Sequence, residues 1–480
     1  MHNRSPLLAF VLLTLVFIEG YIVLAYELIA LRLVVPYAGS GANSSSIIIA
    51  AVLLPLALGY QSGGLFKNKT RTFRQKLLLN FSLALPFLVL GASYLFLDIF
   101  FKALITIGIH NPLVQISIYS IFFIMPPVYW LGQTVPLITN FYRKAHMPAV
   151  TGRILLISTL GSLLGSLLTT LVLMSYLGVH RTALIVGVCL IVLILLISKK
   201  KYMLRLAYTG IIGSICFGLN SAYFIKKNRI HSFNQYNLVQ TQDEADSHMR
   251  YFMLNGKAAG AYNTDTGDKL YYIQHIEDYY LKPLAKVTEH PLDILALGGG
   301  GMTLGSDDTE NYYSYVEIDP HLKEVTEKHL LKKPLTPNKE FIALPIRQFL
   351  ATNTQKYDLI VLDINDWENV PAHLMTEEFF LDVKKMLKNK GIFVAMFLSS
   401  AEPSSNFARN ISATLARSLF PFNRYPAHTI SNGLGYDFKD MFLDTVIHVY
   451  YKEHDIEATP YNDLKNRAYF DSFKQIKSHN

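Results

Sequence analysis

Seven long apolar runs fill the first 225 residues of the chain and decide what this half can fold into. Each run has about the 20 residues that an α-helix needs to cross the hydrocarbon core of a bilayer. The runs lie near residues 7–35, 44–66, 76–101, 112–141, 153–177, 181–198 and 203–225. The composition agrees, because 51% hydrophobic and 17% charged residues make the chain too apolar for two soluble domains. The sequence therefore predicts a multi-pass α-helical membrane domain of about seven helices over residues 1–225, with the lipid bilayer as its partner.

Basic residues gather in the second, fourth and sixth loops between these runs: Lys67, Lys69, Arg71, Arg74, Lys76; Arg143, Lys144, Arg153; Lys199, Lys200, Lys201, Arg205. Such loops face the cytoplasm, so the N-terminus is expected on the cytoplasmic side of the cell (inner) membrane. The net charge of +8 is therefore typical of a membrane protein, and no nucleic-acid partner is expected. Seven spans would place the second half outside, whereas Lys226, Lys227 and Arg229 favour the cytoplasm, so its side stays open.

Several residues stand out within the apolar runs. The first run contains Glu19 and Glu27 and is followed by no small-residue cleavage site, so it is expected to remain as an anchor. A charged side chain in a span is costly, which makes Glu27 a functional candidate, with pairing to a neighbouring helix as the alternative. Arg32 lies about 140° further round the same helix and is not expected to pair with Glu27. The two cysteines, Cys189 and Cys216, both fall inside apolar runs and can build neither a disulfide framework nor a zinc site.

Small residues and prolines mark two further features of the membrane half. Gly161 and Gly165 form a small-xxx-small face that lets two membrane helices approach closely. Pro126, Pro127 and Pro136 interrupt the run 112–141, and such breaks are tolerated against protein or a water-filled cavity. A cavity in the membrane half is therefore a further expectation.

The second half begins with short strands and a helix. Residues 236–240 and 251–254 alternate as strands on either side of the polar loop 243–250, which predicts a hairpin lid. Residues 269–286 are expected to form a helix that carries His275 and Glu277, and Glu277 is expected to contribute to substrate binding. We assign residues 226–290 to a β lid and linker helix and residues 291–480 to a second domain.

Strands and helices alternate through this second domain. Strands are expected at 293–297, 313–318, 341–344, 358–362 and 392–397, and helices at 320–331 and 376–388. This alternation predicts an α/β Rossmann-like domain, with a parallel sheet and helices on both faces. Ligands of such sheets bind at the carboxyl ends of the strands.

Three sets of residues are predicted to meet at that edge: Gly298–Gly301 after the first strand, Glu317 and Asp319 after the second, and Asp363 and Asp366 after the fourth. Glycines let the backbone approach a ligand, and Glu317, 19 residues after Gly298, is spaced to accept hydrogen bonds from a ribose diol. Two carboxylates at a strand mouth can hold and deprotonate an amine or anchor a cation. For Asp319 we favour the role of a helix cap ahead of Pro320. For Asp363 and Asp366 the alternative to a role in ligand binding is that each caps the next turn.

Four stretches of the second half resemble the polyamine aminopropyltransferases, that is, the spermidine synthases: 295–300, 316–320, 357–363 and 374–380. In particular the chain is similar to spermidine-synthase-like proteins fused to a multi-pass membrane domain. The membrane half supports the fused subfamily with Tyr26, Glu27 and Arg32, with residues 56–59 and 63–64, and with residues 152–165. The resemblance thus extends over nearly the whole chain.

The resemblance implies a transferase of polyamine biosynthesis that moves an aminopropyl group from decarboxylated S-adenosylmethionine to an amine such as putrescine. Gly298, Gly299 and Gly300 would line the donor, and Glu317 would hold its ribose. Asp363 would deprotonate the attacking amine, and Asp366 would help to bind the substrate. No metal is implied, and a homodimer stays open.

The chain departs from the family pattern at three positions. Gly301 stands where the family has an aspartate for the aminopropyl amine, Pro345 where it has an acid for the adenine, and Asn237 where it has a lid glutamine. Two alternatives follow. One is an S-adenosylmethionine-dependent methyltransferase that acts on a membrane-borne substrate. The other is a module without a donor that binds a ligand, or performs acid–base chemistry, outside the cytoplasm.

Overall fold

The computed structural model describes residues 6–39, 41–66, 73–141, 147–198, 201–221, 229–244, 248–364, 371–399, 406–418, 425–427 and 444–447. The chain divides into two compact units. The first unit consists of Met1–Asn228 with Phe233–Gln235, and the second of Arg229–Ser232 with Tyr236–Asn480.

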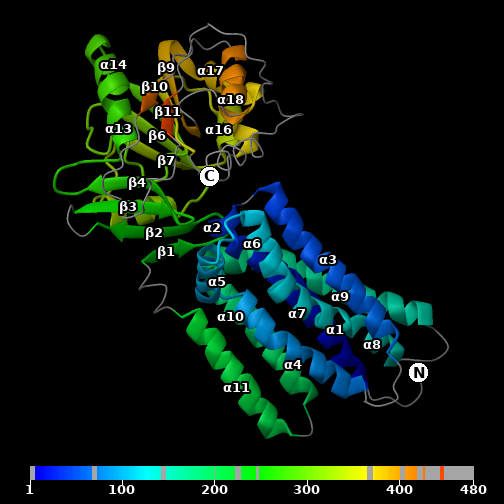
Figure 1. Ribbon diagram of the computed structural model, residues 1–480. Helices are drawn as coiled ribbons and strands as arrows, with labels where there is room; N and C mark the ends of the chain where they lie inside the picture. Colours follow the sequence, from blue (N-terminus) through cyan, green and yellow to red (C-terminus); the bar gives the residue numbers. More distant parts are fainter. Residues whose placement is uncertain are drawn as a thin grey trace. The chain divides into compact units, whose positions relative to one another are not determined.

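Among its described residues, the first unit is built from helices, apart from Phe233 at the end of strand β1 (Ile230–Phe233) and the segment that follows it (Figure 1). They are α1 (Pro6–Leu33), α2 (Val35–Ala38), α3 (Ala42–Gly64), α4 (Phe73–Gly91), α5 (Tyr94–Thr106), α6 (Pro112–Tyr119), η1 (Ser120–Ile124), α7 (Met125–Gly132), α8 (Thr134–Phe141), α9 (Met147–Leu168), η2 (Thr169–Leu177), α10 (Val179–Ile197) and α11 (Tyr202–Leu219).

Seven helical stretches in the described residues are long and apolar enough to cross a membrane, as predicted. They are Ala9–Leu33, Asn43–Gly64, Phe73–Gly91, Pro112–Asn140, Ala149–Leu177, Val179–Ile197 and Tyr202–Leu219. The third is shorter than the apolar run 76–101, because the chain turns at residues 92–93 and Ser93 caps the new helix α5 by accepting a hydrogen bond from the Phe96 N–H. That these helices lie in a bilayer stays a prediction.

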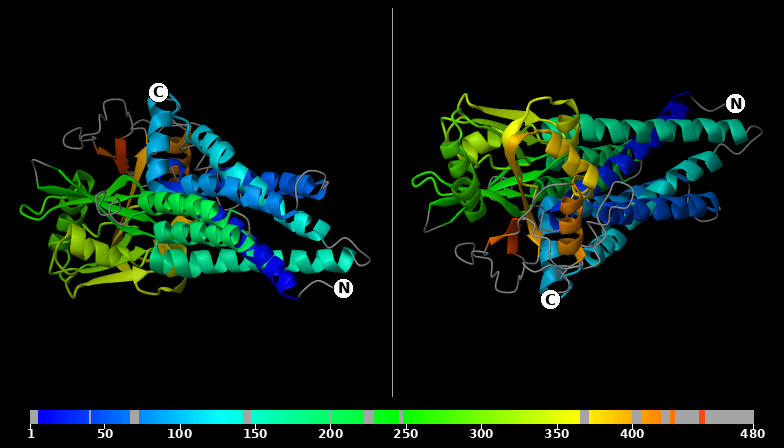
Figure 2. Two further views of the ribbon diagram at one scale, coloured as in Figure 1. Left: turned by 90° about the horizontal axis from the view of Figure 1, so that it is seen from below. Right: turned by 90° about the horizontal axis from the view of Figure 1, so that it is seen from above.

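The helices α1 and α9 lie side by side (Figure 2), and small residues bring their backbones into direct contact. A Cβ atom at Gly161 would lie 2.0 Å from the Phe17 carbonyl oxygen, and one at Gly165 would lie 2.6 Å from the Tyr21 carbonyl oxygen. The Ser162 hydroxyl also donates to the Gly20 carbonyl at 3.2 Å. The predicted packing face of Gly161 and Gly165 is therefore confirmed.

The second unit contains two sheets. The smaller one has the order β1-β2-β3-β4, with β1 (Ile230–Phe233), β2 (Leu238–Asp243), β3 (Met249–Leu254) and β4 (Lys257–Asn263). The expected hairpin lid corresponds to β2 and β3, and the sequence prediction missed β1 and β4. The predicted helix 269–286 is present as α13 (Tyr271–Ile276), η3 (Glu277–Leu281) and α14 (Lys282–Val287).

The larger sheet has seven strands in the order β10-β11-β9-β8-β5-β6-β7. Its parallel part is formed by β5 (Asp293–Leu297), β6 (Tyr312–Glu317), β7 (Lys339–Ala343), β8 (Tyr357–Leu362) and β9 (Leu387–Ser399). The strands β10 (Tyr425–Ala427) and β11 (Asp444–Ile447) add an antiparallel edge that the sequence prediction did not include. The predicted parallel sheet is therefore confirmed and extended.

Helices cover both faces of this sheet because residues along a strand point alternately to either side. Leu295 and Leu297 pack with α16 (Ile346–Thr352), α17 (Glu377–Lys385) and α18 (Asn406–Arg417). Ile294 and Ala296 pack on the other face with α13, η3, α15 (Leu322–Val325), η4 (Thr326–Leu330) and the smaller sheet. The short 3₁₀ turn η5 (Ala372–Leu374) leads into α17.

Candidate active site

Three adjacent strands carry the predicted site residues to one edge of the sheet. The central strand β5 pairs in parallel with β8 on one side and with β6 on the other. The Gly298 N–H donates to the Val316 carbonyl at 3.0 Å, and the Asp363 N–H donates to the Leu297 carbonyl at 2.9 Å. The ends of the three strands therefore lie level, and the glycine turn is flanked by Glu317 and Asp363.

Gly298 is required where β5 ends. Its φ of +87° is a conformation that L side chains rarely adopt, and a Cβ atom there would lie 2.6 Å from the Asp363 carbonyl oxygen. The backbone of the turn can therefore pass directly beside the end of β8.

Glu317 closes β6 as a buried carboxyl group. Burial raises its pKa to about 8, and the negative charges of Asp319 and Asp363 add to the rise, whereas the Ile318 N–H, 3.2 Å from Oε2, opposes it. A buried carboxyl group at this edge can exchange hydrogen bonds with hydroxyl groups of a ligand.

Asp363 follows β8 as a half-buried residue. The Tyr272 hydroxyl of α13 donates to its Oδ2 atom at 3.1 Å. Burial raises the pKa of Asp363 to about 7, although the Tyr272 hydrogen bond acts in the opposite direction. A carboxyl group with a pKa near neutrality is suited to accept a proton from an amine. The sequence prediction missed Tyr272, because nothing in the run of tyrosines indicates which ring faces a strand end.

Asp319 caps a turn instead of the helix for which we predicted it. Its Oδ1 atom accepts a hydrogen bond from the His321 N–H at 3.0 Å, two residues further on, and α15 begins one residue later. The other oxygen, Oδ2, lies 3.4 Å from the amide nitrogen of Asn237. Asp319 therefore links the end of β6 to the smaller sheet and is fully buried there.

Residues of the smaller sheet and of η4 lie beside Gly300 and Gly301. A Cβ atom at Gly300 would lie 3.1 Å from Leu254 Cδ1, and one at Gly301 would lie 3.0 Å from Leu330 Cδ2 and 3.6 Å from Gly260 Cα. Gly301 is thus enclosed by its neighbours. A Cβ atom at this position would require the end of the Leu330 side chain to shift by a few tenths of an ångström, whereas the β4 backbone lies at ordinary contact distance.

The other positions that depart from the family pattern can also be located. Pro345 follows β7 and precedes α16, so the strand beside β6 ends without an acid at that position. Asn237 precedes β2 and contacts both Asp319 and Asn255. Asp366 lies outside the described residues.

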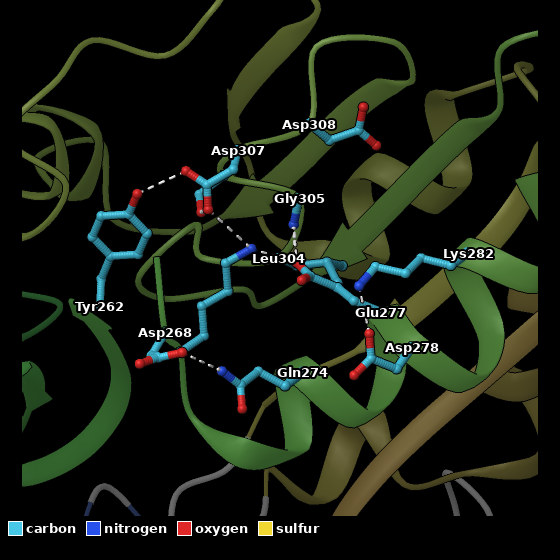
Figure 3. Close-up of polar contacts among 12 residues, drawn as sticks. Tyr262, Asp268, Gln274, Glu277, Asp278, Lys282, Leu304, Gly305, Asp307 and Asp308 are labelled. Atoms are coloured by element: carbon cyan, nitrogen blue, oxygen red, sulfur yellow. Dashed lines mark hydrogen bonds and ion pairs between the residues drawn. The ribbon is translucent and has the colours of Figure 1, made fainter. Parts of the chain in front are cut away.

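Glu277 belongs to a charged cluster that also contains Lys269 and Asp307. Figure 3 shows Glu277 close to Gly305, and Asp307 close to Tyr262. Its Oε1 atom accepts hydrogen bonds from Lys269 Nζ and from the Gly305 N–H, both at 2.7 Å. Asp307 accepts hydrogen bonds from Tyr262 and Lys333, each at 2.7 Å. Burial of Asp307 raises its pKa, but these two bonds and the charge of Lys269 outweigh burial and lower it to about 2. The cluster ties β4, η3 and the loop after β5 together, and the substrate-binding role of Glu277 stays a prediction.

The fold and the edge residues define a Rossmann-like domain that carries the carboxyl groups of Glu317 and Asp363 at the carboxyl ends of its parallel strands. The described residues contain no group of His, Cys, Asp and Glu side chains that could hold a metal ion. No family model matches the chain.

The chain is similar to curated proteins that are named polyamine aminopropyltransferases. The chain is 25% identical over 320 residues to the polyamine aminopropyltransferase of Oceanobacillus iheyensis, covering 58% of each protein. It is 23% identical over 413 residues to polyamine aminopropyltransferase 2 of Aquifex aeolicus, covering 79% of this chain and 77% of that protein. A solved structure of a probable spermidine synthase from Corynebacterium glutamicum is 16% identical, with a TM-score of 0.38, and the match covers 46% of this chain and 79% of that one.

The chain is thus a homologue of the polyamine aminopropyltransferases, and the predicted resemblance to that family is confirmed. It spans 48%, 58% and 40% of the length of the first three curated relatives, about half on the whole. Membership of the membrane-fused subfamily stays a prediction.

Proposed function

We propose that the chain is a membrane-bound transferase that moves an aminopropyl group from decarboxylated S-adenosylmethionine to a putrescine-like amine. The observation that carries this proposal is the half-buried Asp363, a carboxyl group with a pKa of about 7 beside the glycine turn. The names of the curated relatives support the same type of reaction.

The proposed chemistry needs one base. The neutral nitrogen of the acceptor attacks the carbon beside the sulfonium, the new C–N bond forms as the C–S bond breaks, and methylthioadenosine leaves. Asp363 takes the proton that the nitrogen loses, and the Tyr272 hydroxyl holds the carboxylate in place. Glu317 binds the ribose hydroxyls, the backbone of Gly298, Gly299 and Gly300 lies along the donor, and Asp366 contributes to acceptor binding.

Gly301 favours a second candidate, a transferase that uses S-adenosylmethionine itself or a domain that uses no donor. Gly301 offers no carboxylate for the ammonium group of the aminopropyl chain, and a side chain at this position would have to shift the end of the Leu330 side chain. Loss of one hydrogen bond to a charged group weakens binding by about 1.5–3 kcal/mol.

The path of the chain through the first unit bears on the side of the membrane at which the chain leaves the seventh helix. The turn at Ser93 lies at the end of the unit where α11 finishes, because the Ser93 hydroxyl lies 3.5 Å from the Leu219 carbonyl oxygen. The ends of α1 and η2 contact the segment that follows α11, through Arg32 with Asn234 at 2.7 Å and Ser175 with Gln235 at 3.0 Å. With the basic loops in the cytoplasm, the chain would leave the seventh helix on the outer side.

Two experiments test the proposal. Calorimetry on the purified full chain would compare decarboxylated S-adenosylmethionine, S-adenosylmethionine and methylthioadenosine. Tighter binding of the decarboxylated donor supports aminopropyl transfer, preference for S-adenosylmethionine supports the methyltransferase, and no binding at millimolar concentration supports the domain without a donor. A reporter fused to the C-terminus gives the side of the membrane, and a signal from outside would contradict transfer from a cytoplasmic nucleoside donor.

A further inference from the structure

The first unit contains a cavity of about 210 Å³ that is lined by residues of this unit alone. Its wall is formed by the end of α1, by α2 and the residues that flank it, by the start of α3 and by η2, together with Gln235 from the segment after α11. The predicted proline breaks do not line it. The cavity is therefore a feature of the helix ends.

The polar part of the wall is rich in hydrogen-bond donors. Arg32 is 8% exposed, and its Nε atom donates to the Asn234 carbonyl at 2.7 Å, which fixes the guanidinium at the wall. Within the described part of the chain, the hydroxyls of Ser45 and Thr170 and the amide nitrogen of Gln235 have no hydrogen-bond partner. Ser45 also belongs to the first turn of α3, a helix of 23 residues whose N-terminal end carries partial positive charge.

The charge on the cavity wall is positive. The lining residues, all of them from the described ranges, include Arg32 and no aspartate or glutamate. A buried guanidinium, two hydroxyls and a helix N-terminus are groups that bind phosphate and carboxylate oxygens. The chemistry of the cavity therefore favours an anion.

The remaining wall is apolar and limits how much of a ligand can enter. Leu28, Leu31 and Met174 face the same cavity as Arg32. A volume of about 210 Å³ corresponds to roughly seven water molecules at about 30 Å³ each, enough for an acidic group and a few carbon atoms. We propose that this cavity binds the acidic group of an anionic amphiphile, a phosphate or a carboxylate that carries a hydrocarbon chain.

Binding to the purified full chain in a neutral detergent tests the proposal. The probes are dioctanoyl phosphatidylglycerol, dioctanoyl phosphatidylcholine with the same chains and no net charge, and octanoate. We expect phosphatidylglycerol or octanoate to bind at least about tenfold more tightly than phosphatidylcholine. Preference for phosphatidylglycerol identifies a lipid headgroup, and preference for octanoate identifies a free organic acid. Equal binding of all three, or no binding, overturns the proposal.

Two neighbouring serines provide matched variants. Ser45 lines the cavity, whereas Ser46 is exposed. Ser45→Ala and Thr170→Val should each weaken anion binding about threefold to tenfold, because each removes one donor, and Ser46→Ala should leave it unchanged. Arg32→Gln should abolish the preference for the anion. If Arg32→Gln fails to fold, the comparison of Ser45→Ala with Ser46→Ala tests the proposed site. Equal anion affinities of these two variants overturn the proposal.

Discussion

The Tyr272 hydroxyl donates a hydrogen bond to Asp363 Oδ2 at 3.1 Å, which joins the start of α13 to the end of β8. This bond stabilises the charged form of Asp363 and works against the rise in pKa that burial causes. A side chain on a helix outside the sheet thereby adjusts the proposed base.

Tyr272→Phe should therefore shift the pH profile of the proposed reaction. Loss of the hydroxyl raises the pKa of Asp363 above about 7, so less of the carboxylate is available at neutral pH. We expect kcat to fall several-fold at pH 6 and to recover as the pH rises to 9. Tyr271→Phe is the matched control, because Tyr271 is 45% exposed. Profiles that differ by the same factor at every pH would show that Tyr272 has a different role.

Asp363→Asn should remove the proposed base and leave the fold intact. The amide cannot take a proton from the acceptor amine, and general-base catalysis contributes on the order of 10²–10⁴-fold. Product formation with decarboxylated S-adenosylmethionine and putrescine measures the loss. Asp382→Asn changes an exposed aspartate that pairs with Lys385 and should behave as the unaltered protein does. Equal rates in the two variants would refute the assignment of Asp363.

Glu317→Gln should weaken binding of methylthioadenosine. A glutamine offers one oxygen atom to a ribose diol where the carboxyl group offers two, and each hydrogen bond lost is worth about 1–3 kcal/mol. Calorimetry should show affinity reduced about tenfold or more. Glu324→Gln is the control, since Glu324 pairs with Lys328 on the surface. An unchanged affinity of Glu317→Gln would place the ribose elsewhere.

Glu317 also makes folding stability depend on pH. Its pKa is raised to about 8 in the folded state, from about 4.3 in an unfolded chain, so the folded state holds the proton more tightly between these values. The stabilising contribution is complete below about pH 4 and is lost as the pH rises through 8. Hydrogen exchange of β6 in the full chain should accelerate between pH 6 and 9 beyond its intrinsic rate, and Glu317→Gln should remove the excess.

The placement of Gly298, Glu317 and Asp363 could be predicted from the sequence, because the carboxyl ends of parallel strands meet at one edge of a sheet. Each strand is a short, nearly continuous apolar run, typical of a strand that is buried on both faces. The small-residue face of Gly161 was equally predictable, since its spacing fits one side of a helix.

The residues that the sequence prediction missed depend on tertiary contacts. The strand β4 has the sequence Lys-Ala-Ala-Gly-Ala-Tyr-Asn, which contains no β-branched residue, and its pairing with β3 defines it. Lys269 and Asp307 are 38 residues apart and approach to 3.5 Å in the folded unit. The direction of the Tyr272 ring likewise depends on how α13 packs against the sheet.

Gly305 gives a prediction about the loop after β5 that does not depend on the proposed activity. Its φ is +64°, its N–H donates to Glu277, and a Cβ atom would lie 2.1 Å from the Tyr313 ring. In Gly305→Ala the new methyl group would overlap the Tyr313 ring, and the alanine backbone would be strained by the positive φ. Together these effects should destabilise the unit by about 3 kcal/mol or more. Gly256 has a φ of +82° with no described atom within 4 Å of such a Cβ, so Gly256→Ala should cost only about 1 kcal/mol.

Pulse proteolysis of the two full-length variants compares their losses of folding stability. Cleavage between Gly305 and Tyr313 should increase strongly in Gly305→Ala and little in Gly256→Ala, because the overlap with the Tyr313 ring separates the two positions. Equal cleavage would mean that backbone strain alone determines the loss of stability in both variants, and that the Tyr313 ring moves aside freely. That result would contradict the close packing of Tyr313, which is 2% exposed and whose hydroxyl donates to Asp308 Oδ2 at 2.5 Å.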